Sequence, residues 1–271
     1  MTDALLKLEG AGNDFVLGFG DWAVRLAADA GLVVRLCDRR RGIGADGVLA
    51  VERRGDDRIR LLHRNADGGR PGFCANGTRC AAAAARRLLG VRPELVVETD
   101  RGEIAARVAS GEVTLTLAAV APPRPLEVTV EDRPAPAWLL EVGVPHLVVA
   151  VDRVEAVDLA TEGPRLRALP LAGPEGSNVH LSGRRGDELE VRSFERGVEG
   201  ETWCCGSGVV AAALLEMAAS GRHRVVVRPR SGDRLTVAVP RGPFDGPVEA
   251  TGPVRFVGRL QPFPEWLESQ P

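Results

Sequence analysis

Hydrophobic and polar residues alternate over short stretches of the sequence. This pattern predicts a protein built mainly of strands. Residues 47–62 alternate apolar and charged side chains around a Gly55-Asp56 turn, a pattern typical of a β-hairpin. Further strands are expected at 5–19, where a Gly-Asn-Asp turn separates two of them, and at 95–99, 104–108, 113–117, 225–227 and 235–239, with a strand pair around 143 and a second hairpin around 186–187.

Two alanine-rich segments, residues 78–89 and 209–220, predict helices of an unusual kind. Both are apolar on nearly every side, and they end at Gly90 and Gly221. This pattern indicates buried helices with a glycine at the C-terminal cap. Residues 21–36, in contrast, predict a single surface helix.

The two buried helices belong to an internal repeat with an offset of 131 positions. Cys74-Ala75-Asn76-Gly77 precedes the first helix, and Cys205-Gly206-Ser207-Gly208 precedes the second. The same offset relates Arg53-Arg54-Gly55-Asp56 to Arg184-Arg185-Gly186-Asp187, Gly12 to Gly143, Gly47 to Asn178 and Asn65 to Arg196, and it has slipped by one at Gly102 and Gly232. The repeat predicts an α+β fold with two pseudo-symmetric halves, each a mostly antiparallel sheet wrapped around a central helix.

A proline-rich segment, residues 121–136, is expected to link the two copies, since proline disfavours both helix and central strand. The tail after residue 252 has no counterpart in the repeat, and we expect it to pack on the first half. The predicted halves are therefore 1–120 with 253–271, and 121–252, with an active site in the cleft between them.

Composition argues against several classes of function. A net charge of −2 over 271 residues favours neither nucleic acid nor an anionic membrane as partner. No apolar run approaches the roughly 20 residues needed to span a bilayer, and the first residues do not resemble a signal peptide. Five cysteines without such a signal indicate a reducing cytoplasm. Four histidines and no Cys-x-x-Cys motif argue against a zinc site.

Cys74 and Cys205 are the strongest candidates for chemistry, since each stands at the start of a buried helix. Free N–H groups and a partial positive charge there bind carboxylates and lower the pKa of a thiol. Two facing thiols suit a reaction that takes a proton from one face of a carbon and returns it to the other. Alternatives are a structural role for each cysteine or a redox disulfide between them. Cys37, Cys80 and Cys204 are expected to be packing residues.

Short motifs over nearly the whole chain carry a resemblance to a known family. The motifs are Gly10–Phe15, Gly42–Gly47, Asn65–Gly68 and Cys74–Cys80 in the first half, and Pro145-His146, Gly176–Val179, Glu195–Gly197 and Gly200–Gly208 in the second. In this order they resemble diaminopimelate epimerase, a cofactor-independent amino-acid epimerase.

The resemblance implies a small-molecule amino-acid substrate. Members of this family interconvert LL- and meso-diaminopimelate in bacterial lysine and peptidoglycan precursor synthesis, without pyridoxal phosphate. Neither a cofactor nor a metal is therefore expected, and the family suggests a homodimer. One cysteine, as thiolate, would remove the α-proton, and the other, as thiol, would deliver a proton from the opposite face. By position these are Cys74 and Cys205.

The resemblance also implies roles for the surrounding residues. The backbone at Ala75-Asn76 and at Gly206-Ser207 would hold the reacting carboxylate. His146 and Glu195 would tune the protonation of the cysteines. The further substrate-binding positions are Asn13, Asn65, Asn178, Glu195 and Arg196.

Each of these side chains has a structural alternative. Asn13 and Asn65 would also suit turns, and His146 would suit a buried histidine with satisfied hydrogen bonds. Glu195 and Arg196 would also form an ordinary surface ion pair.

Three positions depart from the family pattern. Val144 stands where many members carry an asparagine, and Gly47 replaces a polar residue found in some members, so both remove possible hydrogen bonds to substrate. Ala75 replaces a glycine but keeps its N–H group.

Other functions remain open at this point. Proline, hydroxyproline and histidine racemases of the same superfamily keep two thiols but bind another side chain. Glu195-Arg196 favours a substrate with a second amino-acid head, whose carboxylate and ammonium would pair with these charges. A related isomerase branch lacks the two cysteines, which this sequence retains. The presence of both cysteines also argues against a non-catalytic amino-acid-binding protein.

Overall fold

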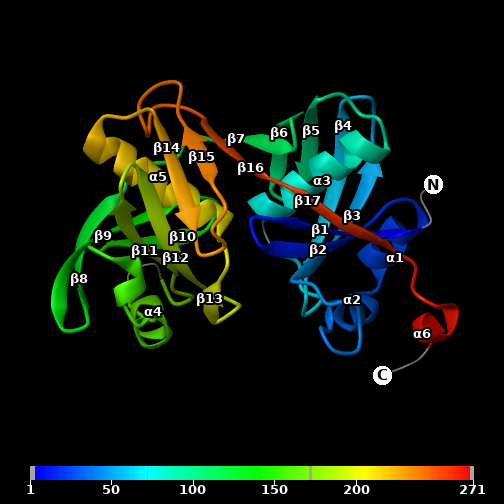
Figure 1. Ribbon diagram of the computed structural model, residues 1–271, viewed down its shortest axis with the longest axis horizontal. Coiled ribbons are helices and arrows are strands. Elements are labelled where there is room, and N and C mark those ends of the chain that lie inside the picture. The colour runs from blue at the N-terminus through cyan, green and yellow to red at the C-terminus, as the bar shows by residue number, and fades with distance from the viewer. Residues whose placement is uncertain (1–3, 72, 171–172, 269–271) are drawn as a thin grey trace. The chain divides into compact units, whose positions relative to one another are not determined.

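The computed structural model describes residues 4–71, 73–170 and 173–268. The chain divides into two compact units, unit 1 with residues 1–115 and 253–271, and unit 2 with residues 116–252. The chain leaves unit 1 within β7 (Glu112–Leu117) and returns to it at the end of β16 (Val248–Pro253) (Figure 1).

Unit 1 is a sheet wrapped around one helix. Its strands are β1 (Leu5–Gly10), β2 (Asn13–Gly18), β3 (Gly47–Arg53), β4 (Arg58–Asn65), β5 (Glu94–Thr99), β6 (Gly102–Ala109) and β17 (Arg255–Leu260). Its helices are α1 (Asp21–Ala28), α2 (Ala30–Cys37), α3 (Ala75–Leu88) and α6 (Pro264–Glu268). The strands pair in the order β17–β1–β2–β3–β4–β5–β6, and all these pairs are antiparallel except β2–β3 and β4–β5.

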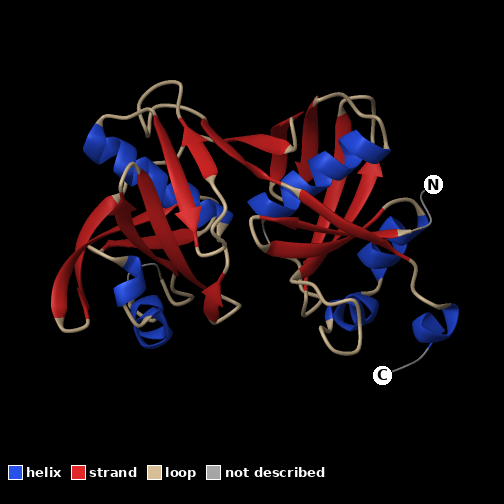
Figure 2. Ribbon diagram, in the orientation of Figure 1, coloured by secondary structure: helices blue, strands red, loops and turns tan. Residues whose placement is uncertain are grey.

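Helices cover both faces of this sheet. The central helix α3 contacts β1 to β6, while α1 and α2 pack against β3 and β4 (Figure 2). Val48 and Ala50 of β3 join the cluster under α1 and α2, and Leu49 between them points to the start of α3. Since successive strand residues face opposite sides, β3 must be apolar at consecutive positions.

Unit 2 has the same plan around α5 (Gly206–Ser220). Its other strands are β8 (Arg124–Val130), β9 (Arg133–Glu141), β10 (Pro145–Ala150), β11 (Asn178–Arg185), β12 (Glu188–Glu195), β13 (Gly200–Thr202), β14 (Arg224–Pro229) and β15 (Leu235–Ala238). Its other helical elements are η1 (Val154–Ala156) and α4 (Leu159–Arg167), of which α4 packs against β11 to β13. The strands pair in the order β8–β9–β10–β11–β12–β14–β15–β16, with β10–β11 and β12–β14 parallel and the rest antiparallel.

The two units share the alternation of antiparallel and parallel pairs, and also the register at their centre. Phe15 lies opposite Gly47 between β2 and β3, and His146 lies opposite Asn178 between β10 and β11. Both members of the second pair follow those of the first by 131 positions. The predicted α+β class is thus confirmed.

The hairpins that follow are not in the same register. Leu49 lies opposite His63 in unit 1, and its repeat partner His180 lies opposite Ser193 in unit 2, which is one residue nearer. The hairpin of unit 2 is therefore one residue shorter. The sequence offset that paired Asn65 with Arg196 is wrong by one, because the ladder places Glu195 at the position of Asn65.

The predicted surface helix at 21–36 is interrupted. Asp29 separates α1 from α2 in an extended conformation, and its Oδ1 accepts the Leu32 N–H at 2.9 Å as an N-terminal cap. An aspartate favours this position because its carboxylate satisfies a free N–H group of the next helix.

The proline-rich segment 121–136 is not a plain linker, since it contributes to β8 and β9. Pro125 lies near the start of β8, and Pro134 and Pro136 precede the part of β9 that pairs with β10. Proline has no N–H group to donate to a neighbouring strand. Where the strand has no neighbour on one side, a proline facing that side removes no ladder hydrogen bond, which explains why these strands tolerate it.

Candidate active site

Cys74 is the N-terminal cap of α3, because the helix begins at Ala75, three residues before the predicted start. Its Sγ accepts the Gly77 N–H at 3.4 Å and lies 3.7 Å from Oδ1 of Asn13. The sulfur thus sits where the free N–H groups of the helix point. Such a position stabilises a thiolate.

Asn13 is held in place on its other side. Its Nδ2 donates to Oδ2 of Asp46 at 2.7 Å, which directs Oδ1 toward Cys74 and toward Nδ2 of Asn76 at 3.4 Å. Oδ1 of Asn76 in turn accepts a 2.6 Å hydrogen bond from the buried guanidinium of Arg79. Asn13, Cys74 and Asn76, predicted from separate motifs, therefore form one hydrogen-bonded group.

A small pocket in unit 1 opens beside Cys74, and His63 of β4 lines it together with Thr78 of α3. The cavity holds about 20 Å³, enough for one water molecule. Both ring nitrogens of His63 are buried without a hydrogen-bond partner among the described residues, and burial lowers its pKa to about 4. A Cβ on Gly47 would lie 2.9 Å from Nε2 of His63, so the imidazole occupies space that the missing side chain leaves.

Cys205 is the N-terminal cap of α5 and is buried. Its pKa lies well above the usual value, first because burial disfavours the thiolate and then because the Glu195 carboxylate lies beside it. The N–H of Gly208 and the hydroxyl of Ser207, 3.7 Å from Sγ, act in the opposite direction. The expectation that the helix start lowers the thiol pKa is thus wrong for Cys205, since desolvation outweighs the helix field.

Glu195 is fixed near this sulfur by the hydroxyl of Thr202, which donates to its carboxylate. The neighbouring Arg196 donates its backbone N–H to Oδ1 of Asn178 at 2.8 Å, and its guanidinium pairs with the exposed carboxylate of Glu175 at 2.9 Å. The partners of Glu195 and Arg196 are thus different residues. The Glu195 carboxylate lies beside the Cys205 sulfur, and the Arg196 guanidinium pairs with an exposed carboxylate.

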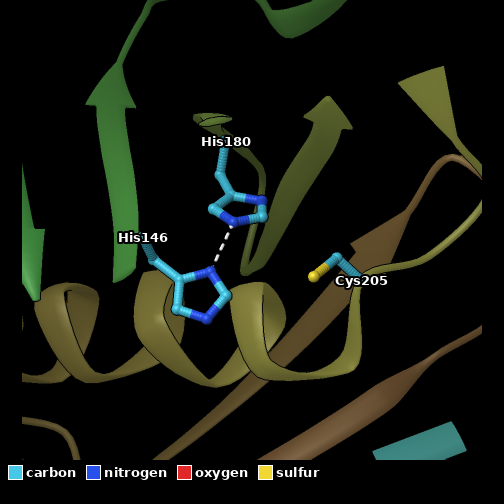
Figure 3. A group of neighbouring side chains, drawn as sticks. All are labelled: His146, His180 and Cys205. Atoms are coloured by element: carbon cyan, nitrogen blue, oxygen red, sulfur yellow. Dashed lines mark hydrogen bonds between the residues drawn. The ribbon is translucent and has the colours of Figure 1, made fainter. Parts of the chain in front are cut away.

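His146 lies beside Cys205 in a buried group that also contains His180 (Figure 3). Its Nδ1 is 2.8 Å from Nε2 of His180, and Nδ1 of His180 is 2.9 Å from Oγ of Ser193. Burial lowers the pKa of His146 to about 4 and that of His180 well below its usual value. Both imidazoles are therefore neutral at physiological pH.

One nitrogen of each imidazole and the sulfur of Cys205 lie within 4.8 Å of one another. Two histidines and a cysteine are ligands that Zn²⁺ accepts. In this structure, however, the facing nitrogens of His146 and His180 are already joined by a hydrogen bond, which a metal would have to displace.

Asn65 lies apart from the other predicted residues of unit 1. It ends β4 opposite Gly47, its side chain is exposed, and its backbone closes a turn with Gly68 and Gly69. Cys37, Cys80 and Cys204 are buried as expected. Burial raises the pKa of Cys37 to about 12 and that of Cys80 further.

Sequence reasoning missed three polar residues near the cysteines, namely His63, His180 and Ser193. The signal was present, since each interrupts an otherwise apolar or charged strand pattern with a small or aromatic polar side chain. The repeat also relates Leu49 to His180, so it could have marked His180 as a polar residue at a position that is apolar in the first copy.

No described helix is long and apolar enough to cross a bilayer.

Solved structures with this fold define the class. A phenazine biosynthesis protein of the PhzF family from Enterococcus faecalis superposes with a TM-score of 0.75 at 14% identity, covering 97% of this chain and 100% of its own. A hydroxyproline epimerase from Agrobacterium vitis gives 0.67 at 17% identity, covering 95% and 90%. The fold is thus one that epimerases use.

The sequence narrows this class to one family. The diaminopimelate epimerase family model matches residues 5–119 and 138–257. The diaminopimelate epimerase of Chlorobaculum tepidum is 34% identical over 260 residues, covering 93% of this chain and 98% of its own, and that of Moorella thermoacetica is 34% identical over 282, covering 94% and 97%. The chain belongs to the diaminopimelate epimerase family, and it is an isomerase.

Proposed function

We propose that this protein epimerises LL-diaminopimelate to meso-diaminopimelate, with Cys74 and Cys205 as its two acid–base groups. One observation carries the proposal beyond family membership: each unit places a cysteine at the N-terminal cap of its central helix. A reaction that inverts one carbon requires an acid–base group on each face. Two caps at the same place in two similar units provide such a pair when they face one another across the substrate.

The two thiols differ in the form they favour. Burial and Glu195 keep Cys205 protonated, whereas Cys74 accepts an N–H bond from Gly77 at its sulfur. In this proposal Cys205 therefore acts first as the thiol that delivers a proton, and this leaves Cys74 as the base that removes the α-proton from the opposite face. After turnover their roles are exchanged.

The reacting carboxylate would be held by the helix starts. The backbone N–H groups at Ala75-Asn76 and Gly206-Ser207 lie in the first turns of α3 and α5, where N–H groups are free to bind an anion. They would stabilise the charge that develops as the α-proton leaves, without a cofactor as electron sink.

The distal end of the substrate carries a second carboxylate and ammonium. Arg196 would bind this carboxylate in place of Glu175, whose side chain is exposed. Asn178 fixes the backbone of Arg196, and Asn65, at the end of β4, would contact the same region of the substrate. His146 and Glu195 would adjust the protonation of Cys205.

Proton exchange in heavy water tests the proposal. Reduced protein would be incubated with LL-diaminopimelate, L-proline and L-histidine separately, while deuterium entry and inversion at the α-carbon are followed. Inversion of diaminopimelate that is lost in Cys74→Ala and Cys205→Ala is expected. Turnover of another amino acid alone would overturn the substrate, and no exchange on any of the three would overturn the reaction.

We also propose that the enzyme acts in the cytoplasm as a homodimer. The five free cysteines suit a reducing compartment. Sedimentation at equilibrium on reduced protein would give the mass of the assembly, and the mass of a single chain would contradict the dimer.

A further inference from the structure

A buried hydrogen-bond chain leads from Ser193 through His180 to His146, and Figure 3 shows its link between the two imidazoles. All three side chains are almost completely shielded from solvent. Nε2 of His146 has no hydrogen-bond partner among the described residues, so it is the open end of the chain. A buried polar atom without a partner needs an explanation, because it costs desolvation free energy.

Gly208 leaves the space that the His180 imidazole of this hydrogen-bond chain occupies. A Cβ on Gly208 would lie 2.1 Å from Cε1 and 2.5 Å from Nδ1 of His180, so only glycine permits the imidazole to lie under the first turn of α5. The equivalent Gly77 of unit 1 lies over Leu49 instead, and a Cβ there would be 3.1 Å from the leucine Cδ2.

Among the described residues, this hydrogen-bond chain occurs in unit 2 and not in unit 1. The strand registers place Phe15, Leu49 and His63 in unit 1 where unit 2 has His146, His180 and Ser193. The first two of these are apolar, so the equivalent described positions of unit 1 cannot form a hydrogen-bond chain of this kind. The chain therefore lies next to Cys205 and has no counterpart at the equivalent positions near Cys74.

Neutral imidazoles joined in this way constrain one another. If Nδ1 of His146 carries its proton, it donates to His180, which then donates to Ser193, and Nε2 of His146 is left as an acceptor. If Ser193 donates to His180, then His180 donates to His146, and Nε2 of His146 carries a proton. A hydroxyl can donate or accept, whereas a neutral imidazole must do one at each nitrogen. The tautomer of His146 is therefore tied to both other residues.

We propose that His180 and Ser193 are positioning residues that hold His146 neutral and in a single tautomer beside Cys205. This inference rests on the proposed function, in which Cys205 gains and loses a proton in each cycle. A fixed tautomer keeps the proton on the same nitrogen of His146 in every cycle, and one of the two ring nitrogens lies within 4.8 Å of the Cys205 sulfur. It adds no charge to a site that already contains the Glu195 carboxylate next to Cys205, with the Arg196 guanidinium near His146.

Nitrogen NMR of ¹⁵N-histidine-labelled protein at neutral pH reads the tautomer directly. Wild type is expected to show one tautomer of neutral His146. His180→Leu, which installs the residue of unit 1, is expected to give a mixture of tautomers and a kcat lower by about 10- to 100-fold with little change in KM, the loss usual when a partner that orients a histidine is removed. His180→Gln should recover part of both, since its amide can still bond to His146.

Two further variants complete the test. His223→Gln is the matched control, because the His223 side chain is exposed and its Nδ1 bonds to the Arg241 carbonyl at 2.7 Å, and it should leave kcat and the His146 signals unchanged. Ser193→Ala removes the far end of the chain without altering His180, so it carries the test if His180→Leu does not fold. The proposal would be overturned if His180→Leu or Ser193→Ala folds and shows either an unchanged His146 tautomer or an unchanged kcat.

Two outcomes would point elsewhere. Stoichiometric Zn²⁺ uptake by reduced wild type that is lost in His180→Leu would replace the proposal with a metal site at His146, His180 and Cys205. Wild type without α-proton exchange would overturn the proposed function, while the NMR signals would still decide whether His180 orders His146.

Discussion

Asn13 and Asp46 are joined by a 2.7 Å hydrogen bond that turns Oδ1 of Asn13 toward the sulfur of Cys74. Asp46 also accepts the backbone N–H of Asp14 at 3.3 Å and an ion pair from Arg39 at 2.7 Å. The carboxylate thus anchors the turn that carries Asn13. Asp46 therefore sets the position of Asn13, a residue predicted to bind the substrate.

Removing this anchor should slow the reaction. In Asp46→Ala we expect kcat to fall about 10-fold, because Asn13 loses its fixed orientation beside the reacting sulfur. The measurement is the rate of diaminopimelate epimerisation at saturating substrate. Asp56→Ala is the control, since Asp56 pairs only with Arg53 at an exposed hairpin turn. Equal kcat in both variants would show that Asn13 keeps its place without Asp46.

Replacing Glu195 should make Cys205 titrate at lower pH. Burial is the largest cause of the raised pKa of Cys205, and the Glu195 carboxylate adds to it. Glu195→Gln keeps the shape but removes the charge, so alkylation of Cys205 should begin at a lower pH while the thiol stays above its usual value. Mass spectrometry of the labelled peptide at several pH values gives the titration. Glu190→Gln on the same strand should leave the curve unchanged, and a curve unchanged in Glu195→Gln as well would rule out the carboxylate effect.

The buried His63 should make the fold sensitive to acid. Its pKa is lowered from 6.5 to about 4, so between these values the unfolded chain binds a proton that the folded chain does not. The free energy of unfolding therefore falls as the pH drops through this window, by up to about 3 kcal/mol from this group. In His63→Leu this part of the loss should disappear. Urea unfolding of both proteins across the window measures the difference, and parallel curves would contradict the prediction.

Two glycines at equivalent places should respond differently to alanine. Gly208→Ala forces a methyl group into the ring of His180 and should destabilise the protein by about 1–3 kcal/mol, the usual cost of overpacking. Gly77→Ala meets Leu49 at 3.1 Å and Phe15 at 3.5 Å, contacts that small shifts relieve. Thermal unfolding should show a larger drop in Tm for Gly208→Ala. The reverse order would mean that the His180 ring moves aside freely.

The sequence by itself determined the elements whose causes are local. Alanine-rich apolar segments closed by Gly90 and Gly221 predicted the central helices α3 and α5. The repeat of Cys74 and Cys205 predicted the two cysteines that we propose as the acid–base pair. Strand alternation and turn residues predicted the hairpins, because the side chains involved are neighbours along the chain.

The tertiary structure decided whatever depends on pairing between distant segments. The loss of one residue in the second hairpin became visible only in the strand registers, which moved Glu195 to the place of Asn65. The proline-rich segment forms β8 and the first part of β9, where the strands have a neighbour on one side only, and β9 gains β10 as its second neighbour after the last proline.

The setting of each cysteine also came from the tertiary structure alone. Motifs placed Cys74 and Cys205 at equivalent helix starts and left open which of them is ionised. Burial and the Glu195 carboxylate raise the pKa of Cys205, and behind it lie His146 and His180, at positions that Phe15 and Leu49 occupy in unit 1. Solvent exclusion and contacts across strands set a pKa, and neither can be read from the local order of residues.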